Sequence, residues 1–180
     1  DEIITGFRLS LGGAQEYYNI KPDMATLGKV LGGGFPMAAF GGKKEIMQNI
    51  SPSGKIYQAG TFSGNPVSTT AANTVLKILT QRKSEIYPKL EKKCKELSKA
   101  LVDLSINYHI DTKVYNIASM YQIFFSSDAV YDMASAKLAD NQRFQVYFHE
   151  LLKNGVFVPP GQFETCFIST AHIDEDLKNT

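Results

Sequence analysis

One segment of the chain reads Thr26-Leu27-Gly28-Lys29-Val30-Leu31-Gly32-Gly33-Gly34-Phe35-Pro36. The apolar residues before it predict a strand over Met24–Leu27, and the glycines after it predict a tight loop. A nucleotide-binding P-loop is excluded, because Lys29 precedes the glycines whereas the motif G-x-x-x-x-G-K-[ST] places its lysine after them. The segment therefore predicts that Lys29 lies directly after the end of a strand.

Two further features lie on either side of this lysine. Asp1 stands where an opening strand is expected to end, and Gly60-Thr61 lies in a loop before a predicted helix. A second strand is expected at residues 37–40 and a short helix at 43–50. Pyridoxal phosphate needs a carboxylate beside its ring nitrogen and a lysine that binds its aldehyde, so Asp1 and Lys29 together suit this cofactor. Thr61 suits its phosphate, which helix starts favour.

A long helical region follows and begins at Asn65-Pro66, where asparagine can cap the first turn and proline already has a helical φ. Five apolar residues recur in it at spacings of three and four, which predicts one buried face: Leu90, Cys94, Leu97, Leu101 and Leu104. The charged residues between them are expected on the solvated side: Lys89, Glu91, Lys92, Lys93, Lys95 and Glu96.

The rest of the chain alternates between strand and helix patterns. Strands are expected at residues 121–125, 156–158 and 166–170, and a helix at 136–153 that Asn154-Gly155 ends. His172 is expected at a helix start. This part therefore predicts a small α+β domain.

Composition excludes several classes of function. A net charge of +1 from 19 basic and 18 acidic residues gives no broad patch for nucleic acid or an anionic membrane. No apolar run approaches the roughly 18 residues of a membrane span. Cys94 and Cys166 lie outside any C-x-x-C spacing, and His109, His149 and His172 lie far apart, so neither a disulfide framework nor a metal site is expected. A reducing compartment is predicted.

Several separated phrases resemble, in order and spacing, the class III aminotransferase family. They are Asp1-Glu2-Ile3-Ile4-Thr5-Gly6-Phe7-Arg8, Pro22-Asp23, Thr26-Leu27-Gly28-Lys29 and Gly32-Gly33-Gly34-Phe35-Pro36. Three others are similar to the aminomutase branch of that family: Gly12-Gly13-Ala14-Gln15, Ala39-Phe40-Gly41-Gly42 and Tyr57-Gln58-Ala59-Gly60-Thr61-Phe62-Ser63-Gly64-Asn65-Pro66. The likeness continues weakly through residues 80–150 and returns at Val158-Pro159-Pro160-Gly161-Gln162-Phe163-Glu164-Thr165-Cys166-Phe167-Ile168-Ser169.

The resemblance implies an α/β fold, part of the fold-type I large domain with a small α+β domain. Residues 1–80 would form the second half of the large domain, 81–105 a connecting helix and 106–180 the small domain, incomplete at its end. Lys29 would bind pyridoxal phosphate and shuttle protons, with a pyridoxamine phosphate form in the cycle. Asp1 would pair with the ring nitrogen. Gly60 and Thr61 would bind the phosphate in the neighbouring subunit of a homodimer, and Glu164 would lie near the substrate entrance unless it is simply an exposed loop acid.

The aminomutase branch moves an amino group from carbon 2 to carbon 1 of glutamate 1-semialdehyde, which gives 5-aminolevulinate for tetrapyrrole synthesis. The resemblance therefore implies a cytoplasmic protein, or one of the plastid stroma in a photosynthetic eukaryote. Two alternatives stay open: a transaminase that uses ornithine or an ω-amino acid, and a non-catalytic remnant. The sequence is expected to be a carboxy-terminal fragment that lacks the main phosphate loop and the ring-stacking aromatic. We therefore expect this polypeptide alone to be inactive, although the parent enzyme is active.

Overall fold

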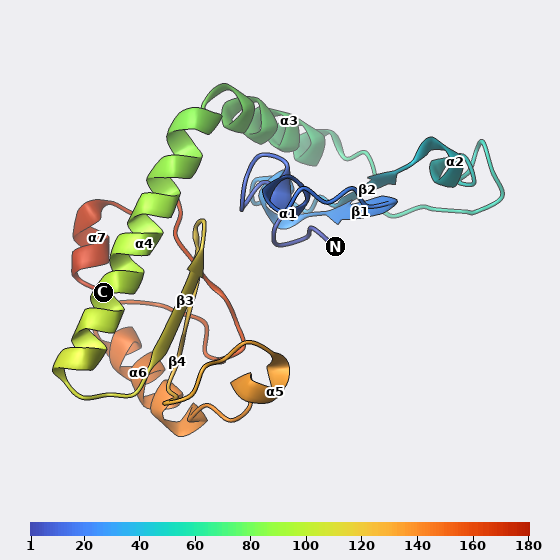
Figure 1. Cartoon of the computed structure of the whole chain (residues 1–180). Coiled ribbons are helices and arrows are strands. Elements are labelled where there is room, and N and C mark those ends of the chain that lie inside the picture. Colours follow the sequence, from blue (N-terminus) through green and yellow to red (C-terminus); the bar gives the residue numbers. More distant parts are fainter. The chain divides into compact units, whose positions relative to one another are not determined.

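A pair of short strands organises the first part of the chain (Figure 1). The computed structural model describes residues 1–180 and divides them into two units, Asp1–Ile86 and Tyr87–Thr180. In the first unit, β1 (Met24–Leu27) pairs antiparallel with β2 (Ala39–Gly42), so that Thr26 lies opposite Phe40. Glu2 adds a parallel bridge to Leu27. The predicted strand at β1 is confirmed, whereas the strand predicted at 37–40 lies two residues later, because its pairing with β1 begins only at Ala39.

Helices complete the first unit. They are α1 (Gly13–Tyr17), the 3-10 helix η1 (Lys29–Gly32), α2 (Lys44–Met47) and α3 (Pro66–Gln81). The predicted start of α3 is confirmed, since the Asn65 side chain accepts hydrogen bonds from the N–H groups of Val67 and Ser68, each at 3.1 Å. The short helix expected at 43–50 is reduced to α2.

The second unit packs helices against a small antiparallel sheet. The sheet runs in the order β3 (Lys113–Ile117), β4 (Met120–Phe124) and β5 (Cys166–Phe167), and the first two strands form a hairpin beside α4 (Lys83–Asn107) (Figure 1). The Cys94 thiol of α4 donates to the carbonyl of Met120 at 3.4 Å, which joins helix and sheet. The buried apolar residues of this unit include Leu90, Cys94, Leu97, Leu101, Tyr121, Ile123, Phe144, Phe148, Val158, Cys166 and Ile168.

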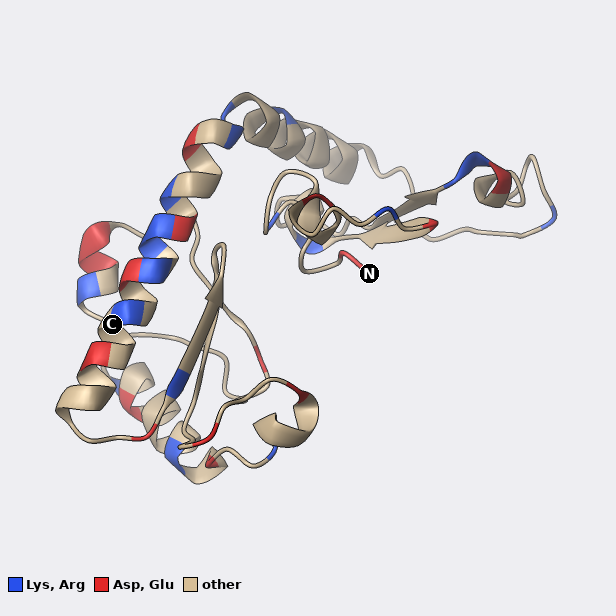
Figure 2. Cartoon of the chain, viewed as in Figure 1, with Lys and Arg blue, Asp and Glu red and all other residues tan.

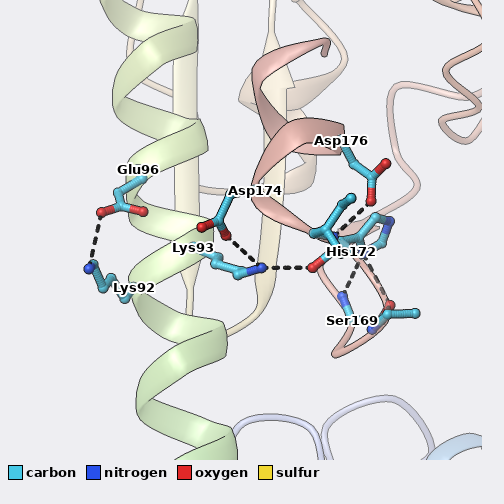
Figure 3. A network of polar contacts seen from close by, with 9 residues as sticks. Lys92, Lys93, Glu96, Ser169, His172, Asp174 and Asp176 are labelled. Carbon is cyan, nitrogen blue, oxygen red and sulfur yellow. Dashed lines mark hydrogen bonds and ion pairs between the residues drawn. The ribbon is translucent and has the colours of Figure 1, made fainter.

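Two residues of α4 contradict the helical pattern. Leu104 was expected on the buried face but is 49% exposed, because it lies near the end of the helix. Lys93 was expected on the solvated side but is buried. Its amine donates to the carbonyl of His172 at 2.7 Å and pairs with Asp174 at 2.9 Å, the first residue of α7 (Asp174–Lys178) (Figure 3). The lysine therefore attaches α7 to α4. Figure 2 shows basic and acidic residues interspersed along α4.

Three predictions for the rest of the second unit need correction. The helix expected at 136–153 is divided into α5 (Met133–Ala136) and α6 (Asn141–Lys153), because Asp132 and Asp140 each cap a new first turn. Residues 156–158 form no strand, the strand at 166–170 shortens to β5, and β3 was not predicted. His172 precedes α7 by two residues. None of the helices combines the length and the apolar content that a membrane crossing needs.

Candidate active site

The turn after β1 presents Lys29 in an unusual backbone conformation. Gly28 is buried and extended. Lys29 then begins η1 with a φ of 43°, which residues other than glycine seldom adopt. Such a conformation costs on the order of 1–3 kcal/mol and persists only where the surrounding structure imposes it. The side chain is exposed and forms no ion pair, so its amine is available for reaction.

The glycines after Lys29 let this turn pack against α3. Gly33 has a φ of 58°, and a Cβ placed on it would lie 2.6 Å from Cγ2 of Val75 in α3. Leu31 and Gly32 are buried beside it. Both the backbone conformation and the close approach therefore require glycine at position 33.

Asp1 lies beside the strand that leads to this turn. Its Oδ1 accepts hydrogen bonds from the N–H of Ile3 at 2.8 Å and from Oγ1 of Thr26 at 3.1 Å. The N–H of Glu2 donates to the carbonyl of Thr26 at 2.8 Å. Because Thr26 comes three residues before Lys29, the structure brings Asp1 and Lys29 onto adjacent segments that run in the same direction.

Glu2 is a buried carboxylate that the sequence analysis did not single out. Only 3% of it is exposed, and it accepts hydrogen bonds from the Thr5 hydroxyl and from the N–H groups of Ala14 at 3.0 Å and Gln15 at 2.8 Å. Burial alone would raise the pKa of Glu2, but these donors outweigh it and hold the pKa below its ordinary value. Glu2 thus ties α1 to the segment that carries Asp1. The position of Glu2 directly after Asp1 is the sequence feature that could have identified it.

Gly60 and Thr61 lie in an exposed turn before α3. The N–H of Ser63 donates to the carbonyl of Gly60 at 2.9 Å, whereas the hydroxyl of Thr61 forms no hydrogen bond within the chain. Because Asn65 already occupies two N–H donors of α3, an anion here would be bound mainly by the Gly60–Thr61 turn. No hydrogen bond or ion pair joins Thr61 to Asp1 or Lys29.

Glu164 belongs to the second unit and lies in the loop before β5. Its N–H donates to the carbonyl of Gly161 at 3.0 Å, and its exposed carboxylate forms no ion pair. Its position near a substrate entrance stays a prediction. No group of three or more His, Cys, Asp or Glu side chains is placed to hold a metal ion.

Comparison with known proteins indicates one family. Residues 1–178 match the sequence profile described as "Aminotransferase class-III". The glutamate-1-semialdehyde 2,1-aminomutase of Methanococcus maripaludis is 54% identical over 180 residues, which are 100% of this chain and 42% of that protein. The protein of the same name from Methanothermobacter thermautotrophicus is 52% identical with the same coverage. The chain therefore spans 42% of the length of these curated relatives.

Solved structures agree on the fold. A β-phenylalanine aminotransferase from Variovorax paradoxus superimposes with a TM-score of 0.82 at 26% identity, over 99% of this chain and 41% of that chain. A glutamate-1-semialdehyde aminomutase from Pseudomonas aeruginosa does so with a TM-score of 0.78 at 20% identity, with the same coverage. The predicted α/β fold, as part of a fold-type I structure, is thereby confirmed.

Proposed function

This chain belongs to the class III aminotransferases, and on that premise we propose that it carries the cofactor lysine, Lys29, of a pyridoxal phosphate enzyme. The full-length enzyme that contains this chain converts glutamate 1-semialdehyde to 5-aminolevulinate by intramolecular amino transfer. The observation that carries the proposal is 54% identity over the whole chain to a relative named for this reaction. A solved structure at 25% identity, the PLP internal aldimine form of the FumI protein of Sphingopyxis, supports the choice of cofactor.

The residues of the first unit fit this cofactor. Pyridoxal phosphate supplies an electron sink for the bond changes at the amine-bearing carbon. Lys29 binds it through Nζ and moves protons at that atom, which its uncommitted amine allows. Asp1 holds a proton on the ring nitrogen. A carboxylate about 4 Å from a cation is worth about 4 kcal/mol at an effective dielectric of about 20, or nearly three pKa units.

The remaining assignments concern the phosphate and the substrate. Thr61 and Gly60 bind the cofactor phosphate of a neighbouring subunit, so that a homodimer shares its active sites. The exposed turn and the uncommitted Thr61 hydroxyl support this assignment. Glu164 lies near the substrate entrance and disfavours amino acids that carry an α-carboxylate, consistent with its exposed, unpaired carboxylate.

The test uses the full-length protein that contains this chain. We expect it to form 5-aminolevulinate from glutamate 1-semialdehyde with no external amino donor and to show the visible absorbance of bound pyridoxal phosphate. Faster turnover of ornithine or of an ω-amino acid would make it a transaminase instead. The 180-residue chain alone is expected to form no product.

A lysine exchange tests the attachment site. Lys29→Ala should remove the visible band and the adduct that borohydride fixes to the protein, because no amine remains in that turn. Lys55→Ala is the matched control, since Lys55 is another exposed lysine of the first unit. A fixed adduct found on a different lysine by peptide mass analysis would reassign the site.

A further inference from the structure

We propose that Thr26 is a positioning residue that gives the two oxygens of the Asp1 carboxylate separate roles. The proposal rests on the function proposed above. Both hydrogen bonds that Asp1 accepts within the chain end on Oδ1, from the N–H of Ile3 and from Oγ1 of Thr26. Oδ2 accepts none. The geometry therefore reserves Oδ2 for a donor outside the chain, which in the proposed enzyme is the protonated ring nitrogen.

The hydroxyl of Thr26 is needed because little else holds the carboxylate. Asp1 is exposed, so no packing fixes the rotation about its last bond, and that torsion is broad for aspartate. The N–H of Ile3 alone gives one point of attachment. A second donor on the same oxygen fixes the plane of the carboxylate and hence the direction of Oδ2.

The backbone of β1 holds Thr26 in place for this role. Its carbonyl accepts the N–H of Glu2, and Thr26 lies opposite Phe40 in the strand pair. A β-branched side chain in a strand has few rotamers, so the hydroxyl keeps its direction. Three residues later the same segment reaches Lys29. Thr26 thus holds the carboxylate of Asp1 beside the segment that carries the amine of Lys29, and both groups must reach one ring.

The variant Thr26→Val separates a role in stability from a role that acts through Asp1. The side chain of Thr26 is exposed, so removal of its hydroxyl leaves no buried polar group unpaired. Valine has the same shape and favours strands equally well. Thr26→Val should therefore leave the urea unfolding midpoint nearly unchanged, and any loss of function would have to act through Asp1.

The test compares variants of the full-length protein. Thr26→Val is expected to weaken pyridoxal phosphate binding about tenfold and to lower kcat about tenfold with KM within about twofold, since a hydrogen bond to a charged group is lost. Thr26→Ser restores the hydroxyl and should recover most of both. Thr80→Val, at an exposed threonine of α3 with no side-chain hydrogen bond, is the matched control.

A double-mutant cycle decides whether Thr26 acts through Asp1. In an Asp1→Asn background, Thr26→Val should add almost nothing, because the carboxylate that it orients is gone. Full additivity, or a Thr26→Val protein that matches the Thr80→Val control, would overturn the proposal. If the unchanged protein binds no cofactor at Lys29, the proposed function itself fails, and this outcome is separate from the two above.

Discussion

Replacement of Lys93 by methionine should weaken the attachment of α7 to α4. The change removes the hydrogen bond from Nζ to the carbonyl of His172 and the ion pair with Asp174. Methionine keeps the apolar stem of the lysine, so packing along α4 is largely retained. A hydrogen bond to a charged group contributes about 1.5–3 kcal/mol, and removal of a buried ammonium returns part of this. We expect the free energy of unfolding to fall by about 1–2 kcal/mol.

The neighbouring lysine provides the control. Lys92 is exposed, with an ion pair to Glu96 at 3.8 Å on the same helix face, and such pairs contribute little (Figure 3). Lys92→Met should change the free energy of unfolding by less than about 0.5 kcal/mol. With a urea slope of about 2 kcal/mol per M, the unfolding midpoint of Lys93→Met should fall by roughly 0.5–1 M. Circular dichroism follows the unfolding of the chain.

The pH dependence of stability in the acid range gives a second measurement. The hydrogen bond from Lys93, then its charge, lowers the pKa of Asp174 below the ordinary value of 3.8. A lowered carboxyl pKa stabilises the folded chain above the ordinary pKa, and this stabilisation is lost as the pH falls through the folded-state pKa. The difference between the unchanged chain and Lys93→Met should therefore shrink below about pH 4. An equal midpoint for both lysine variants, or a higher one for Lys93→Met, would refute the reasoning.

Three further predictions concern Glu2, Gly33 and Cys94. Glu2→Gln should make the free energy of unfolding less dependent on pH below the ordinary glutamate pKa of 4.5. The lowered pKa of Glu2 stabilises the fold fully above that value, and this stabilisation is lost as the pH falls through the folded-state pKa; an unchanged pH dependence of the urea midpoint would count against it. Gly33→Ala should cost about 1–3 kcal/mol more than Gly64→Ala, because both positions have a positive φ but only Gly33 faces Val75; equal unfolding midpoints would contradict the clash. Burial raises the pKa of the Cys94 thiol to about 11, so thiol reagents at pH 7 should label it only after unfolding, and rapid labelling of the native chain would disprove this.

Local sequence rules predicted several elements well. The Asn65-Pro66 start of α3 and the strand β1 depend on a few consecutive residues, and both are confirmed. The apolar spacing along α4 correctly placed Leu90, Cys94, Leu97 and Leu101 in the interior. The same rule failed at Lys93, because helical periodicity describes a face and cannot foresee which distant segment will cover it.

The candidate site shows the same division. Motif order pointed to Lys29, Asp1, Gly60 and Thr61, and the family resemblance added Glu164. The positive φ of Lys29, the donor set of Glu2 and the hydrogen bond from Thr26 to Asp1 came only from the structure.

The sequence by itself therefore determined the family and the fold class and named Lys29 as the candidate lysine, since each is recorded in contiguous motifs and their order. Tertiary structure alone decided which groups hold those residues in place. Thr26 and Asp1 lie 25 residues apart, and Lys93 and His172 lie 79 apart. Contacts over such separations leave no periodic mark in the chain, because they arise only when the folded backbone brings the two segments together.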